Sequence, residues 1–152
     1  MDLILWRHAE AEDGIPDGAR KLTPHGLKQA QAVAEWLRSR LPKAARIIVS
    51  PTKRTRQTAE ALAAKFEIAE EIGPGASAKT ILAVAQWPDA KGTVVVVGHQ
   101  PTLGETAALV LSGEPVQWNM KKGAVWWFSH KEKDGNAVVN LHASISPDML
   151  LK

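Results

Sequence analysis

Residues 3–8 read Leu-Ile-Leu-Trp-Arg-His, an apolar run of four residues that stops abruptly at a cation and an imidazole. A short continuous apolar run is typical of a strand that is buried on both faces of a sheet. Such a strand usually ends in turn residues, so the pair Arg7-His8 directly after it needs a separate explanation. Taken alone, His8 could still be an ordinary capping histidine.

Apolar runs and helical patterns alternate along the rest of the chain. Residues 46–50 (RIIVS) and 93–97 (TVVVV) predict two further buried strands. Later strands are predicted at 124–128 and 138–145, with a turn at 133–136. Apolar residues at helical spacing predict four helices, at about 24–40, 52–66, 77–87 and 101–113. This alternation predicts an α/β fold: a three-layer α/β/α sandwich whose mostly parallel central sheet has an antiparallel edge.

Length and composition narrow the class of protein. A chain of 152 residues favours a single domain over residues 1–152, and the absence of cysteine excludes disulfides, thiolate metal sites and a cysteine nucleophile. No N-terminal signal and no membrane span is visible, so we expect a cytoplasmic protein. The net charge of +3 is mild, and its scattered basic residues favour an anionic substrate over nucleic acid. No pattern indicates an oligomeric state.

Three predicted strands end in unusual polar groups. Arg7-His8 follows the first strand, residues 50–54 follow the second, and Gly98-His99 follows the valine-rich strand. In open α/β sheets ligands bind beyond the carboxyl ends of the strands, so the fold would bring these groups to one rim. Two imidazoles and two guanidinium groups, from Arg7 and Arg54, suit a dianionic oxyanion and above all a phosphoryl group.

A metal site and a serine nucleophile are two alternative roles for residues at this rim. A metal site formed by His8, Glu10 and His99 is disfavoured because the adjacent arginines would repel a cation, so no metal and no cofactor is expected. Ser50 has no partner base in any motif, and we interpret it as a turn residue at the strand end rather than a nucleophile. The remaining histidines match no motif and are taken as ordinary: His25, His130 and His142.

The three strand-end motifs together resemble those of the histidine phosphatase superfamily, which includes the phosphoglycerate mutases and acid phosphatases. The resemblance rests on Arg7-His8, on residues 50–58 (SPTKRTRQT) and on residues 98–101 (GHQP), each after a strand and in this order. It extends from about residue 2 to residue 145. The small size further resembles the phosphohistidine phosphatases of the SixA type. A phosphoglycerate mutase-like fold is what this resemblance implies.

The resemblance also implies roles for single residues. His8 would be the nucleophile that is transiently phosphorylated, while Arg7, Arg54 and His99 would hold the phosphoryl oxygens. Arg20 would join them in binding the substrate, although a merely solvated side chain is an equal alternative. The chemistry agrees, because a histidine nucleophile must be neutral at the attacking nitrogen. Flanking arginines should lower its pKa, and a hydrogen bond from its other ring nitrogen to a backbone carbonyl would fix the tautomer.

The sequence departs from the family pattern in two places. Ala9 stands where many members have glycine, which would be costly if that position needs a positive φ angle. Larger members carry a general acid on a long insertion between the second and third motifs. Here residues 55–98 must supply two helices and a strand, so no large cap is expected. Glu70 and Glu71 are the nearest acid candidates, without a recognisable motif.

The lack of a recognisable general acid in the sequence indicates which kind of phosphate compound the protein can cleave. Alkyl phosphate esters have poor leaving groups and need a proton donor, whereas phosphohistidine can leave as neutral imidazole. We therefore expect a metal-independent phosphatase that acts on phosphohistidine of a protein, such as a two-component phosphotransfer domain. The alternatives are a small-molecule phosphomonoesterase and a non-catalytic phosphate-binding module. Strand alternation should turn one of Trp126 and Trp127 outward, beside Trp118, for packing or for partner contact.

Overall fold

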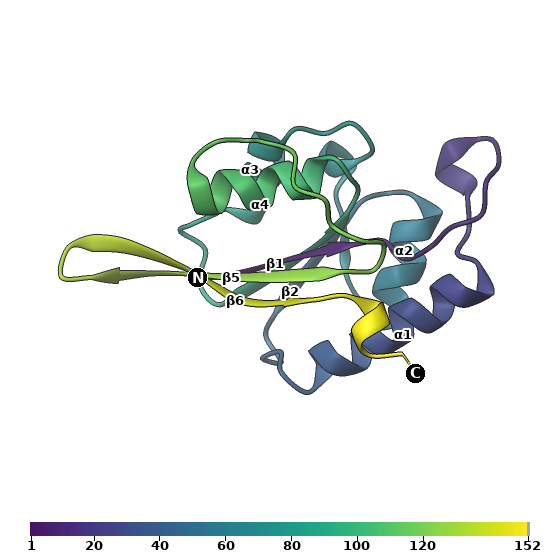
Figure 1. Cartoon of the computed structure of the whole chain (residues 1–152), viewed down its shortest axis with the longest axis horizontal. Coiled ribbons are helices and arrows are strands. Elements are labelled where there is room, and N and C mark those ends of the chain that lie inside the picture. The colour runs from purple at the N-terminus through teal and green to yellow at the C-terminus, as the bar shows by residue number, and fades with distance from the viewer. Residues whose placement is uncertain (152) are drawn as a thin grey trace.

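The computed structural model describes residues 1–151, which form a sandwich of helices around one mixed sheet (Figure 1). The sheet has six strands in the order β3-β2-β4-β1-β5-β6. The strands are β1 (Asp2–Arg7), β2 (Arg46–Val49), β3 (Glu67–Ile68), β4 (Thr93–Gly98), β5 (Val125–Lys133) and β6 (Asn136–Ile145). The helices are α1 (Pro24–Arg38), α2 (Lys53–Glu60), α3 (Ala78–Ala85) and α4 (Thr102–Ser112). Single 3₁₀ turns are η1 (Asp17–Ala19), η2 (Glu70–Ile72) and η3 (Pro147–Met149).

The sheet is parallel in its centre and antiparallel at one edge. β4 pairs in parallel with β1 on one side and with β2 on the other. β5 runs antiparallel to β1, with Trp6 opposite Val125, and β6 returns antiparallel to β5. The predicted α/β fold class with an antiparallel edge is therefore confirmed.

Both faces of the central strands are covered, which explains their continuous apolar sequences. Leu3 and Leu5 of β1 pack under α3 and α4, whereas Ile4 and Trp6 pack toward α1 and α2. Figure 1 shows the two helix pairs on opposite sides of the sheet. Among residues 1–151, no helix is both long and apolar enough to cross a membrane.

Helix boundaries differ from the predicted ones where the chain turns back to the sheet. α2 ends at Glu60 instead of near residue 66. Beyond it, Phe66 packs against the core on the side of the sheet that faces α1 and α2. The next two residues then pair in parallel with β2 as β3, in the connection between the predicted helices at 52–66 and 77–87. α3 begins after Ser77, whose side chain caps it by accepting a hydrogen bond from Thr80 N–H, and it ends at Ala85, before Gln86 in a left-handed conformation.

The position of Ala9 carries no backbone penalty. In residues 1–151 the non-glycine residues with positive φ are Gln86 and Asp134, so Ala9 does not need the conformation that would favour glycine. Its methyl group is fully buried in a small cluster with Leu22 and Ala30. Alanine at this position therefore packs the loop after β1 against α1.

Candidate active site

The carboxyl ends of β1, β2 and β4 meet at one rim of the sheet and surround a polar hollow of about 220 Å³. The five predicted site residues all line it: Arg7, His8, Arg20, Arg54 and His99. Gln100 and Lys122 complete its polar wall. The structure thus brings together residues from four segments that are distant in sequence, while their catalytic roles remain predictions.

Local structure fixes where Arg54 stands. The Thr52 side chain caps α2 by accepting a hydrogen bond from the Thr55 backbone N–H, so Arg54 lies in the first turn of the helix. The Thr55 hydroxyl donates to the Ser50 carbonyl oxygen at 2.7 Å, which ties this turn to the end of β2. Arg54 is therefore held beside the strand ends although its side chain is long and flexible.

His8 is held in the tautomer that a nucleophile needs. Its Nδ1 lies 2.7 Å from the Ala9 carbonyl oxygen, which can only accept, so Nδ1 carries the proton and Nε2 keeps its lone pair. The predicted hydrogen bond to a backbone carbonyl is thus present. Burial first, and then the charges of Arg54 and Arg7, lower the pKa of His8 to about 4 against the opposing effect of the Ala9 hydrogen bond. Burial, rather than the arginines named from the sequence, is the largest cause.

His99 faces His8 and is oriented by Ser50. The two imidazole centroids lie 5.4 Å apart. The Nε2 of His99 lies 2.7 Å from the Ser50 hydroxyl, and its Nδ1 lies 3.4 Å from Nη2 of Arg54. Because an arginine only donates, Nδ1 accepts and Nε2–H donates to Ser50. Burial, followed by the charges of His8 and Arg54, lowers the pKa of His99 to about 3.

The interpretation of Ser50 as a turn residue was therefore incomplete. Its side chain is fully buried and acts as the hydrogen-bond partner of His99. Its position at the start of the 50–58 motif was the available signal. The partner could not be inferred, because His99 lies 49 positions away and meets Ser50 only where β2 and β4 pair.

Two guanidinium groups that line the same hollow as His8 have unused donors. Arg7 donates from Nη1 to the Met120 carbonyl oxygen at 2.8 Å, and Arg54 donates from Nη1 to the Asp17 carbonyl oxygen at 2.9 Å. The Nε–H of each arginine is buried and has no hydrogen-bond partner in residues 1–151. Buried donors are nearly always satisfied in folded proteins. These two N–H groups therefore indicate a place where an oxyanion binds.

Asp17 is a site residue that the sequence did not reveal. Its carboxylate accepts from Nη2 of Arg54 and from Nη1 of Arg20, at 3.1 Å each. These contacts, that of Arg20 first, hold the pKa of the Asp17 carboxyl below its usual range. Asp17 thus aligns Arg20 and Arg54. It begins the short 3₁₀ turn η1, which has no apolar periodicity, so no sequence pattern placed it here.

The acid candidates from the sequence do not reach the site. Glu70 and Glu71 lie exposed on η2, and neither lines the hollow. Glu10, which follows the Arg7-His8 pair, accepts a hydrogen bond from the Thr23 hydroxyl at 2.7 Å. Glu10 therefore supports the start of α1.

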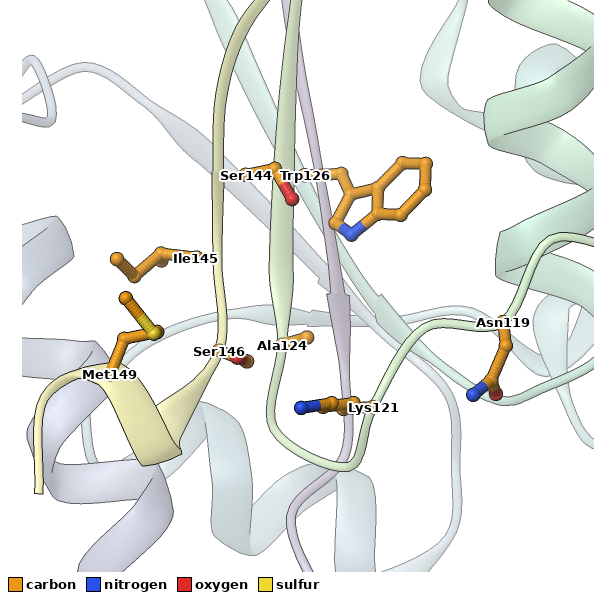
Figure 2. A pocket seen from close by; sticks show the side chains of 8 residues that line it. All are labelled: Asn119, Lys121, Ala124, Trp126, Ser144, Ile145, Ser146 and Met149. Atoms are coloured by element: carbon orange, nitrogen blue, oxygen red, sulfur yellow. The ribbon is translucent and has the colours of Figure 1, made fainter.

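A second hollow, of about 340 Å³, lies beyond residues 119–124 on the same edge of the sheet (Figure 2). It is larger than the first, but its lining contains neither histidine nor arginine. The convergent cations and imidazoles, and not the larger volume, identify the first hollow as the candidate active site.

Known proteins share both the motifs and the fold. The sequence model of the histidine phosphatase superfamily (branch 1) matches residues 3–75. A phosphohistidine phosphatase SixA homolog of Haemophilus influenzae is 34% identical, with 71% of this chain and 76% of the homolog covered. Phosphohistidine phosphatase SixA of Escherichia coli is 29% identical, with 75% and 76% covered. A solved structure of the protein histidine phosphatase SixA complexed with tungstate superimposes with a TM-score of 0.78 at 26% identity, covering 99% of both chains.

The chain therefore belongs to the histidine phosphatase superfamily and is a phosphohydrolase. Its similarity in sequence and structure to the SixA proteins assigns it, within that superfamily, to the SixA type.

Ser50→Ala is expected to lower both stability and activity. The variant leaves the buried Nε2–H of His99 without an acceptor, which should cost about 1–3 kcal/mol of unfolding free energy. Because the His99 ring is then no longer held in place, kcat/KM should fall about tenfold, which corresponds to a loss of about 1.4 kcal/mol of transition-state stabilisation. Urea unfolding and steady-state kinetics measure the two effects. Ser112→Ala, which removes an exposed hydroxyl on α4, is the control. Unchanged values for Ser50→Ala would show that this bond does not orient His99.

The buried histidines predict a stability that falls in mild acid. The pKa of His8 is about 4 in the folded protein against 6.5 in the unfolded chain, so only the unfolded chain binds a proton between these values. Stability should thus decrease as the pH falls from about 6.5 to about 4, by about 3 kcal/mol for His8. Urea unfolding across this range should give a shallower pH dependence for His8→Asn than for the natural protein. Identical slopes would contradict the low pKa.

Proposed function

We propose that the polar hollow binds a phosphoryl group and that the protein removes it through a phosphorylated His8. One observation carries the proposal: His8, whose Nε2 keeps its lone pair, lines the same hollow as Arg7 and Arg54, each of which has a buried guanidinium N–H group without a partner. Two fixed donors and a neutral nucleophile in one hollow are what phosphoryl transfer requires, because the reaction depends mainly on positioning and electrostatic stabilisation.

The proposed reaction has two steps. In the first, His8 Nε2 forms a bond to phosphorus while Arg7, Arg54 and His99 hold the phosphoryl oxygens. The leaving group departs with the electron pair of the broken bond and takes a proton from solvent. The imidazole of phosphorylated His8 gains positive charge, which the Ala9 carbonyl oxygen at Nδ1–H stabilises. In the second step water attacks phosphorus, inorganic phosphate forms, and His8 recovers its lone pair.

Phosphohistidine of a protein is the substrate that this arrangement favours. Among the acids near the site, Asp17 is held ionised by Arg20 and Arg54, so it is a poor proton donor. Imidazole leaves without a strong acid, whereas the alkoxide of a phosphate ester does not. Between Arg54 and His99 the chain forms only α2, β3, η2, α3 and β4, so a bulky protein side chain can approach. The SixA relatives are named phosphohistidine phosphatases, in agreement with this proposal.

A substrate panel tests the proposal. The protein is incubated with a phosphotransfer domain phosphorylated on histidine and, separately, with phosphoserine and sugar phosphates. We expect kcat/KM for the phosphohistidine protein to exceed that for each ester by at least about 100-fold, or about 2.7 kcal/mol in activation free energy. Rapid hydrolysis of esters alone would favour a small-molecule phosphomonoesterase. Phosphate binding without turnover of any substrate would favour a non-catalytic module.

A further inference from the structure

The second hollow is separated from the candidate active site by a single ridge, residues 119–124. Backbone hydrogen bonds join the ridge to the end of β1, which carries His8. Gly123 N–H donates to the His8 carbonyl oxygen, and the Ala124 carbonyl oxygen accepts from Arg7 N–H, at 3.0 Å each. Lys122 of the ridge lines the first hollow and Lys121 lines the second. Residues 119–124 thus line both hollows, so a macromolecule whose phosphate enters the first can also contact the second.

The lining of the second hollow combines apolar walls with hydrogen-bond donors. Trp126 contributes apolar surface on the side of the sheet that faces α3 and α4, whereas Ile145 and Met149 contribute it on the opposite side, and Lys121 extends from the ridge itself (Figure 2). The indole N–H of Trp126 has no acceptor within residues 1–151, whereas those of Trp6 and Trp127 donate to Gly123 and Asp2. Trp126 packs its ring on Trp118, with centroids 5.8 Å apart, and remains half-buried. It is the tryptophan for which the sequence left open a choice between packing and partner contact.

Lys121 is available to a partner. Its ammonium group lies 3.3 Å from the Asp148 carboxylate, and both side chains are well exposed, at 65% and 59%. Exposed ion pairs of this kind contribute little, typically about 0–1 kcal/mol, so an incoming carboxylate can replace Asp148 at small cost. The hollow thus offers a cation and an indole ring, which suit an acidic side chain next to an apolar one.

We propose that the second hollow is the docking surface for the protein that carries the phosphohistidine. The inference rests on the proposed function. The partner places an acidic residue against Lys121 and an apolar side chain on Trp126, while its phosphohistidine enters the first hollow. A low-molecular-weight phosphoramidate fills only the first hollow and gains nothing from the second. The second hollow therefore determines preference for the protein substrate and leaves the chemistry unchanged.

A comparison of a protein substrate with a small one distinguishes an effect on docking from an effect on the chemical step. We would measure kcat/KM for a phosphotransfer domain phosphorylated on histidine and for the phosphoramidate ion, with Lys121→Glu and Trp126→Ala. Both variants are expected to lose about tenfold on the protein substrate, equivalent to about 1.4 kcal/mol, and to stay within about twofold on phosphoramidate. The loss for Lys121→Glu should shrink at high ionic strength, because salt screens exposed charges. Lys131→Glu, on the exposed far end of β5, is the matched control and should change neither value.

Each other outcome counts against the inference. Unchanged kcat/KM on the protein substrate for Lys121→Glu would overturn the docking surface and leave the proposed function intact. Equal losses on both substrates would also overturn it, since the variant would then act through the fold or the first hollow. Turnover of phosphoramidate shows whether each variant is folded. Because Lys121 is exposed, Lys121→Glu still tests the inference if Trp126→Ala unfolds. Failure of the natural protein to act on the phosphohistidine protein would overturn the proposed function, and the docking surface with it.

Discussion

His8→Ala is expected to abolish formation of the phosphorylated protein and to lower kcat/KM by at least about 1,000-fold, as for other nucleophile deletions. The variant removes the atom that attacks phosphorus but leaves the Nε–H donors of Arg7 and Arg54 in place. Binding of inorganic phosphate, measured by calorimetry, should therefore change much less than turnover. Added imidazole can enter the vacated space and should restore part of the activity.

The control is His25→Ala, which removes an exposed imidazole at the start of α1. It should retain full activity and show no response to added imidazole. Hydrolysis by His8→Ala at the natural rate would remove His8 from the mechanism. Loss of turnover together with loss of phosphate binding would instead indicate that the hollow itself had collapsed.

Arg54→Lys is the second change with a large expected effect. Lysine keeps the charge but loses the guanidinium fork, which here donates from Nη1 and Nη2 to Asp17 and leaves Nε–H free for the substrate. Removal of one well-placed donor to a transition-state oxyanion typically costs about 100- to 1,000-fold in kcat. We expect a loss of this size, mainly in kcat, because the charge on the phosphoryl oxygens is stabilised most in the transition state.

Arg56→Lys provides the comparison, since Arg56 belongs to the same motif and helix but is exposed. Its kcat/KM should stay within about twofold of the natural value, as expected for an exposed surface substitution. An Arg54→Lys variant with undiminished kcat would show that the fork does not contact the reacting phosphoryl group. A loss confined to KM would limit Arg54 to ground-state binding.

The positions of Arg7, His8, Arg54 and His99 could be predicted because the sheet topology alone brings the ends of their strands together. Parallel strands in one sheet end at the same rim, so residues that follow two such strands must be close neighbours. Arg20 was harder to predict, because it depends on the loop before α1 folding back over that rim. The structure places Arg20 there through its contact with Asp17, which no periodic pattern reveals.

The sequence by itself determined the class of fold, the rim of the site and the family. It did so through short-range patterns: apolar runs, helical spacing, and polar motifs at strand ends. Only the tertiary structure decided how Ser50 orients His99, how Asp17 holds Arg20 and Arg54, and that burial sets the low pKa of His8. These features arise from contacts between segments far apart in the chain and from exclusion of water. Both appear only after the sheet has formed.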